Sequence, residues 1–219
     1  MARFRQIHFC ERSLAFHSKV SPSGSIAGVI LSGGASRRMG TPKALLRFQG
    51  ETFLDRLIRL FSATCHPVIV VVGEHADAIR YGIQRGRDVL FAVNPDPQRG
   101  MLSSLQCGLA LVPPEAEAAM FLPVDHPHIE VSTIETLAAR FRAEHPPVTV
   151  PTYLGEHGHP VLIARQVIDE LLALPLDAKA SDVIHRHVPQ TTYVEVHDPA
   201  VITDVDDPAA YADLLARHL

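Results

Sequence analysis

The chain has 219 residues, of which 47% are hydrophobic, and a formal net charge of −4. This length and this apolar content suffice for one globular domain with a buried interior, so the chain need not be disordered. The negative charge argues against a nucleic-acid or anionic-membrane partner, because both require a cationic face. It leaves room for a local basic pocket that binds one phosphorylated small molecule.

Residues 1–25 are predicted to form an extension before the domain. They carry cations throughout and no continuous apolar segment, so they do not resemble a secretory signal. No apolar run approaches the ~20 residues that a membrane span requires. Three cysteines without CxxC spacing are typical of reduced thiols, and we therefore expect a cytoplasmic protein. They are Cys10, Cys65 and Cys107.

Residues 26–219 are predicted to form one doubly wound α/β domain. Four short apolar runs are rich in β-branched residues, which is typical of strands buried on both faces of a parallel sheet. They cover 26–31, 67–73, 88–93 and 118–124. Between them, 52–63 and 131–144 place apolar residues at helical spacing. This alternation predicts a mostly parallel, Rossmann-like sheet.

After residue 150 the alternation loosens, which indicates a mixed sheet edge with an appended lobe. The expected elements are a loop at 152–160, a strand at 160–164, helices near 165–173 and 180–187, and a strand at 191–196. The end of the chain, DPAAYADLLARHL, predicts a final helix with Asp207 before Pro208 at the first helical position.

The stretch LSGGASRRMGTPKALL, residues 31–46, follows the first predicted strand, where open α/β sheets bind ligands. Gly33 and Gly34 allow close backbone approach and expose amides to an anion, and Arg37, Arg38 and Lys43 supply cations. An ABC-type ATPase is excluded because the chain has no GxxxxGK[ST], and GxGxxG is absent from this stretch. An ordinary glycine turn with solvated arginines is the structural alternative.

This stretch resembles the signature L-x-[AG]-G-x-S-x-R-M-G-x-x-K-x-L-L of the molybdenum-cofactor nucleotidyltransferases, and the cytidylyltransferases are the most similar members. The similarity covers 26–217. Its further motifs are GMLSSLQCGL (100–109), LPVDHP (122–127), GHPVLI (158–163) and TDVDDPAAY (203–211). The resemblance implies a nucleotidyltransferase fold, an NTP substrate and Mg²⁺.

The resemblance also implies roles for individual residues. Arg38 and Lys43 match the catalytic arginine and lysine that contact the triphosphate, whereas Arg37 lies at a variable position and is expected to be solvated. His159 is a candidate contact of the acceptor, and for Ser103 a helix N-cap is an open alternative. The expected nucleotide contacts are Leu31, Ser32, Gly33, Gly34, Gly100 and Ser104.

Two carboxylates are candidate ligands of Mg²⁺. Asp125 directly follows the apolar run 118–124 and Asp206 follows AVIT, and hard cations prefer carboxylate and phosphate oxygens. The resemblance assigns both to the metal, because PVDxP and D-[IV]-D-x-P hold the metal ligands in the family. Each has a structural alternative. Asp125 could cap the next helix, and Asp206, like Asp204 and Asp207, could be a loop or cap residue.

Thirteen histidines raise the alternative of a transition-metal site. The pairs at i and i+2 are His126/His128, His157/His159 and His185/His187. No third ligand lies at a zinc-type spacing and the cysteines are remote, so a structural zinc is the less favoured interpretation.

The leading hypothesis is an Mg²⁺-dependent nucleotidyltransferase that joins the nucleoside monophosphate of an NTP to a phosphorylated acceptor and releases pyrophosphate. By resemblance, the acceptor is molybdopterin or its molybdenum form, and a molybdoenzyme apo-protein is a further candidate partner. A non-enzymatic carrier of the molybdenum cofactor is the second class of hypothesis. A carrier would lose a catalytic cation or carboxylate, whereas Arg38, Lys43, Asp125 and Asp206 are all present.

The sequence leaves the base of the NTP open. Ser32–Gly34 reads SGG, where cytidylyl members usually carry AAG and guanylyl members AGG, and Gly40–Lys43 departs from the guanylyl GGxDK. GMLSSL, GHPVLI and DVDDP favour CTP. A sugar-phosphate or isoprenoid-precursor cytidylyltransferase would share the same core.

Overall fold

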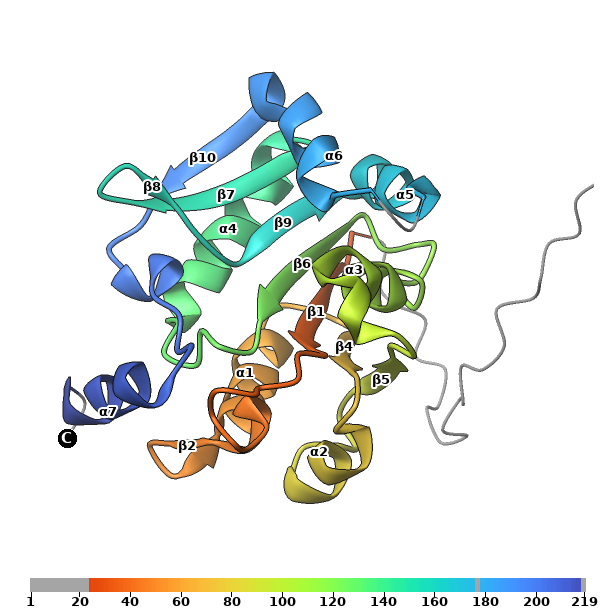
Figure 1. Cartoon of the computed structure of the whole chain (residues 1–219). Helices are drawn as coiled ribbons and strands as arrows, with labels where there is room; N and C mark the ends of the chain where they lie inside the picture. Colours follow the sequence, from red (N-terminus) through yellow and green to blue (C-terminus); the bar gives the residue numbers. More distant parts are fainter. Residues whose placement is uncertain (1–23, 176–177, 218–219) are drawn as a thin grey trace, which may run out of the picture.

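A computed structural model describes residues 24–175 and 178–217 and shows one eight-stranded sheet between layers of helices (Figure 1). The strand order is β10-β7-β9-β6-β1-β4-β5, with β8 paired to β7, and β2 and β3 form a separate hairpin. The strands are β1 (Ile26–Ser32), β2 (Arg47–Phe48), β3 (Glu51–Thr52), β4 (Val68–Val72), β5 (Leu90–Val93), β6 (Ala118–Pro123), β7 (Val148–Tyr153), β8 (Glu156–His157), β9 (Val161–Ala164) and β10 (Thr191–Glu195).

Seven α-helices and four short 3₁₀ helices connect these strands in the described parts of the chain. The α-helices are α1 (Phe53–Ser62), α2 (Ala76–Gly82), α3 (Met101–Leu109), α4 (Val131–Glu144), α5 (Arg165–Ala173), α6 (Ala180–Arg186) and α7 (Pro208–Arg217). The 3₁₀ helices are η1 (Lys43–Leu45), η2 (Pro97–Arg99), η3 (Val188–Gln190) and η4 (Pro199–Ile202).

Three of the four apolar runs become buried central strands, as predicted, namely β1, β4 and β6. The run at 88–93 becomes β5, which lies at the edge of the sheet and is only partly buried, so the prediction of burial on both faces is wrong there. Every residue of β1 and of β4 is buried, because helices cover both faces of the sheet there. Leu57 of α1 and Phe141 of α4 belong to the core on one face, and Leu105 of α3 and Leu171 of α5 belong to the core on the other. The fold is therefore a three-layer α/β sandwich.

All strands of the large sheet are parallel except β8 and β9, so the prediction of a doubly wound, mostly parallel but mixed sheet is confirmed. The prediction of a lobe appended to the sheet is wrong. β9 pairs antiparallel with both β6 and β7, and β10 extends the sheet beyond β7. The buried apolar residues of β9 bring the C-terminal elements into the main sheet rather than beside it.

The predicted extension at 1–25 falls almost entirely outside the described residues, as does Cys10. Cys65 and Cys107 carry free thiols. In the described ranges, no helix combines the length and the apolar character that crossing a bilayer demands.

Candidate active site at the carboxyl ends of β1 and β6

The site lies where the strand order of the sheet reverses. β1 pairs with β4 on one side and with β6 on the other, and Leu31 is in register with Pro123. The loops that leave β1 and β6 therefore emerge side by side at one edge of the sheet. This is the position where open α/β sheets bind ligands.

The loop after β1 folds back on itself so that Lys43 points to the sheet edge. Ser36 adopts a left-handed backbone conformation (φ 48°), and its Oγ accepts a hydrogen bond from the Lys43 backbone N–H at 3.1 Å. Gly33 lies against α3, where an added Cβ would come within 2.9 Å of the Ser104 Oγ. Glycine at this position thus lets the loop and the helix share one wall of a cavity.

This cavity has a volume of about 590 Å³. All the residues predicted to contact the nucleotide, to act in catalysis and to bind the metal contribute to its lining. They are Leu31, Ser32, Gly33, Gly34, Arg38, Lys43, Gly100, Ser104, Asp125 and Asp206. The structure brings them together, and their individual roles remain predictions. Arg37, expected to be solvated, also lines the cavity and is exposed.

An ion cluster of four residues forms part of the cavity lining. The Lys43 Nζ donates to Asp125 Oδ2 at 3.0 Å and to Asp206 Oδ1 at 2.6 Å, and Arg38 lies 3.6 Å from Asp206. Partial burial disfavours the Lys43 charge, but the Asp206 hydrogen bond and the Asp125 charge outweigh it, so the pKa of Lys43 lies above its usual value. The same Lys43 hydrogen bond lowers the pKa of Asp206.

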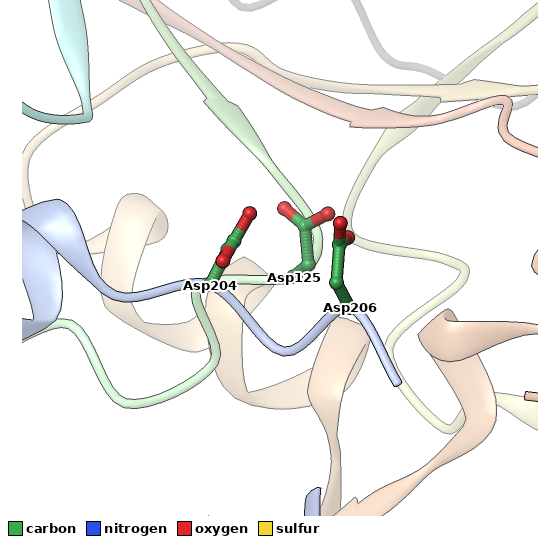
Figure 2. Close-up of side chains that lie close together, drawn as sticks. All are labelled: Asp125, Asp204 and Asp206. Carbon is green, nitrogen blue, oxygen red and sulfur yellow. The ribbon is translucent and has the colours of Figure 1, made fainter. Parts of the chain in front are cut away.

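A third carboxylate, Asp204, joins Asp125 and Asp206 (Figure 2). One oxygen from each lies within 4.8 Å of the others, and the three side chains point toward a common space. Such an all-oxygen set suits a hard divalent cation that takes its remaining ligands from phosphates and water. The residues present therefore fit Mg²⁺ or Mn²⁺. Nothing in the local sequence separates Asp204 from an ordinary loop residue.

The structure decides whether Asp125 and Asp207 cap the helices that follow them. The N-cap of α4 is Glu130, so Asp125 does not cap that helix and its carboxylate instead accepts from Lys43. Asp207 does cap α7, because its Oδ1 accepts from the Ala210 backbone N–H at 2.9 Å.

Ser103 is not the N-cap of α3. The N-cap is Gly100, with φ 90°, and the Ser103 Oγ donates back to the Gly100 carbonyl at 2.9 Å. Asn94, which sequence reasoning missed, is buried behind both serines. Its amide donates to the Ser103 Oγ at 2.9 Å and to the Ser104 Oγ at 3.0 Å. An asparagine directly after the apolar run of β5 was the signal that could have found it.

His159 does not line the cavity. Its half-buried ring packs 5.4 Å from the ring of His126 and 6.2 Å from that of Phe121, measured between centroids. Burial, and then the neighbouring His126, lower the pKa of His159 to about 4, against a smaller opposing effect of Asp125. His159 is therefore a neutral ring near Asp125, outside the lining of the cavity. In the described residues, no histidine belongs to a group of three or more candidate metal ligands.

The family model described as the MobA-like NTP transferase domain matches residues 28–191. The chain is 30% identical over 126 residues to a probable molybdenum cofactor guanylyltransferase of Bacillus cytotoxicus, covering 55% of this chain and 59% of that protein's own length. It is 24% identical over 192 residues to the molybdenum cofactor cytidylyltransferase of Escherichia coli K12, covering 87% and 95%.

Solved structures agree with these matches. Rv0371c of Mycobacterium tuberculosis H37Rv superposes with a TM-score of 0.75 at 30% identity, over 89% of this chain and 98% of that one. A structure of the same protein in complex with manganese gives a TM-score of 0.71 at 28% identity, over 88% and 98%. With the model match spanning most of the domain, this chain belongs to the MobA-like NTP transferase domain family and is a nucleotidyltransferase-family enzyme.

Proposed function

We propose that this protein acts in the cytoplasm and transfers the nucleoside monophosphate of an NTP to the phosphate of a molybdopterin-type cofactor. The preferred NTP in this proposal is CTP. An acceptor phosphate oxygen forms a bond to the α-phosphorus, the bond from that phosphorus to the bridging oxygen breaks, and pyrophosphate leaves. The observation that carries the proposal is the placement of Lys43, between two carboxylates at the end of a glycine-lined cavity.

In this proposal the loop amides after β1 and the cations Arg38 and Lys43 hold the triphosphate and neutralise charge that develops on it. Gly100 and Ser104 contact the nucleoside side of the cavity. Asp125 and Asp206, with Asp204 beside them, would hold Mg²⁺, which supplies charge neutralisation at the phosphates. No side chain has to act as a nucleophile, because the acceptor phosphate does.

We propose CTP rather than GTP because the motifs GMLSSL, GHPVLI and DVDDP resemble those of the cytidylyl members. The relatives bear both names, a cytidylyltransferase and guanylyltransferases, so the base has to be decided by experiment. A molybdenum-cofactor acceptor is supported by what these relatives are named to act on. His159, near Asp125 but outside the cavity lining, stays the proposed acceptor contact. A molybdoenzyme apo-protein is the proposed recipient of the product.

The test measures thermal shift and pyrophosphate release with CTP, GTP, ATP and UTP, each with Mg²⁺, in the presence and absence of molybdopterin. We expect CTP to raise the melting temperature most and pyrophosphate release to require the acceptor. Arg38→Ala and Lys43→Ala should each lower turnover at least about tenfold, roughly 1.4 kcal/mol of transition-state stabilisation. Cofactor binding without pyrophosphate release with any NTP would show a carrier instead. A preference for GTP would replace cytidylyl with guanylyl transfer.

A further inference from the structure

Two of the three clustered carboxylates lie on a segment without regular secondary structure. Residues 203–207 connect η4 to α7, and both Asp204 and Asp206 are exposed. Apart from its ion pairs with Lys43 and Arg38, the exposed Asp206 side chain is placed by the main chain that carries it. The position of Asp206 relative to Asp125 therefore depends on how the segment is attached on either side.

The first attachment is to Asp125 itself. Val205, between the two exposed aspartates, is 2% exposed, and its backbone N–H donates to the Asp125 carbonyl at 2.8 Å. This bond places the main chain of the segment beside the loop that follows β6. It holds the segment at one point and leaves the part beyond Val205 to be held by something else.

The second attachment is made by Tyr211 on α7, which lies beside the β2–β3 hairpin (Figure 1). The ring of Tyr211 packs edge-on against that of Phe53, with centroids 5.8 Å apart, and its hydroxyl donates to the Arg47 carbonyl at 2.7 Å. The Asp207 carbonyl accepts from the Tyr211 backbone N–H at 3.1 Å. The first turn of α7 therefore links Tyr211 directly to the end of the segment that carries Asp206.

Arg47 and Phe53 follow shortly after Lys43 in the chain. Three contacts thus join the stretches 43–53 and 203–211. They are the ion pair of Lys43 with Asp206, the hydrogen bond of Tyr211 with Arg47 and the ring contact of Tyr211 with Phe53. In the proposed function Lys43 turns to the bound triphosphate, which would open this ion pair. The hydrogen bond from Tyr211 does not involve the ion cluster and stays in place.

We propose that Tyr211 is a positioning residue for the metal site, because its hydroxyl keeps Asp206 within reach of Asp125 once Lys43 has left the two carboxylates. This inference rests on the proposed function, in which Lys43 contacts the triphosphate and the aspartates hold the cation. It adds a residue that touches neither the nucleotide nor the metal.

Tyr211→Phe tests the role of the hydroxyl while keeping the aromatic ring on Phe53. Binding of Mn²⁺ is measured in full-length protein from the electron paramagnetic resonance signal of free Mn²⁺, with saturating CTP and, in parallel, with saturating GTP. We expect Mn²⁺ to bind about two- to tenfold more weakly, the range that one neutral hydrogen bond contributes. The Mn²⁺ concentration for half-maximal pyrophosphate release should rise by the same factor, while metal-free nucleotide binding is unchanged.

Tyr193→Phe is the matched control, because it removes a hydroxyl from a half-exposed tyrosine on β10 whose ring stacks on His157. It should bind Mn²⁺ as the wild type does. Equal Mn²⁺ affinity of wild type and Tyr211→Phe would overturn the role of Tyr211 and leave the proposed function standing. If Tyr211→Phe also loses affinity for the nucleotide in the absence of metal, the role of Tyr211 is overturned as well. Such a loss would mean that the substitution loosens the whole site and not the metal ligands alone. If the wild type binds no Mn²⁺ with either nucleotide, the proposed function fails, and the role of Tyr211 with it.

Discussion

Lys43 has two competing sets of partners, the carboxylates that it contacts in the structure and the phosphates that it is proposed to bind. Its side chain is 13% exposed and lies between Asp125 and Asp206. Its positive charge satisfies the same oxygens that a divalent cation needs. Metal binding before the nucleotide arrives must therefore compete with Lys43, whereas a triphosphate draws Lys43 away and supplies further oxygen ligands.

Lys43→Gln should therefore bind Mn²⁺ more tightly than the wild type in the absence of nucleotide, by about tenfold or more, because two carboxylates lose a cation at hydrogen-bond distance. Isothermal titration with Mn²⁺ alone measures this. Arg37→Gln is the control, since it removes a charge from the cavity wall and the described residues offer Arg37 no ion pair. An equal gain in both variants would mean that the overall charge, and not the contact of Lys43, sets the affinity.

Asp125→Asn should keep the fold and lose turnover. The substitution leaves the backbone carbonyl that accepts from Val205 but removes the charge proposed to attract Mg²⁺. Turnover is expected to fall by at least about tenfold and to recover in part with excess Mn²⁺. Metal-free NTP binding should be unchanged or tighter, because Lys43 loses one competing partner. Far-UV circular dichroism, melting temperature and nucleotide titration check this, and unfolding with weaker metal-free binding would assign Asp125 a structural role.

At the scale of elements, a glycine in α3 allows this helix to pack closely against the sheet. A Cβ added to Gly108 would come within 2.6 Å of Val29 Cγ1 and 2.8 Å of Val71 Cγ2, which belong to the central strands β1 and β4. These buried side chains have little room to move. The close approach brings Ser104, one turn earlier on the same helix, to the wall of the cavity.

Gly108→Ala should lower the free energy of unfolding by about 1–3 kcal/mol, the usual cost of an extra methyl group in a packed core. Urea denaturation measures it. Gly86→Ala is the control, because an added Cβ there would meet nothing closer than 3.7 Å. A loss of stability as small as that of the control would show that α3 shifts freely on the sheet.

How far the sequence predicts an element depends on whether its signal is local. α4 was predicted at 131–144 and is observed at Val131–Glu144. The prediction succeeds because the apolar residues at helical spacing all lie within this one short stretch of the chain. The antiparallel insertion of β9 between β6 and β7 was not predictable, since a four-residue apolar run does not specify its neighbours. The same limit applies within the site. Asp125 was found from a local motif, whereas Asp204 acquires its role through Asp125, far away in the chain. Asn94 acquires its role through contacts with Ser103 and Ser104, which belong to another element.

At the scale of the whole molecule, the C-terminal part returns to the site and contacts the elements that precede it. The backbone N–H of His159 donates to the Val201 carbonyl at 2.8 Å, and His126 Nδ1 lies 3.0 Å from the Ala200 carbonyl. The rings of His126 and His159 pack together at this junction. A charge that develops there would be poorly solvated, which makes the stability of the whole fold sensitive to pH.

The pH dependence follows from the neutral state of His159. Its pKa is about 4 in the folded protein, compared with 6.5 for an ordinary histidine, so the unfolded chain binds a proton first as the pH falls. The contribution of neutral His159 to the free energy of unfolding is thus fully present above pH 6.5 and is lost as the pH falls toward 4. The free energy of unfolding should fall by up to about 3 kcal/mol over this range. Urea denaturation of wild type and His159→Gln between pH 7 and pH 4.5 isolates this contribution, because carboxylates that titrate at lower pH are common to both proteins. The wild type should lose more stability than the variant over this range. Parallel losses would mean that His159 takes up its proton without cost, and that the junction with His126 is open to water.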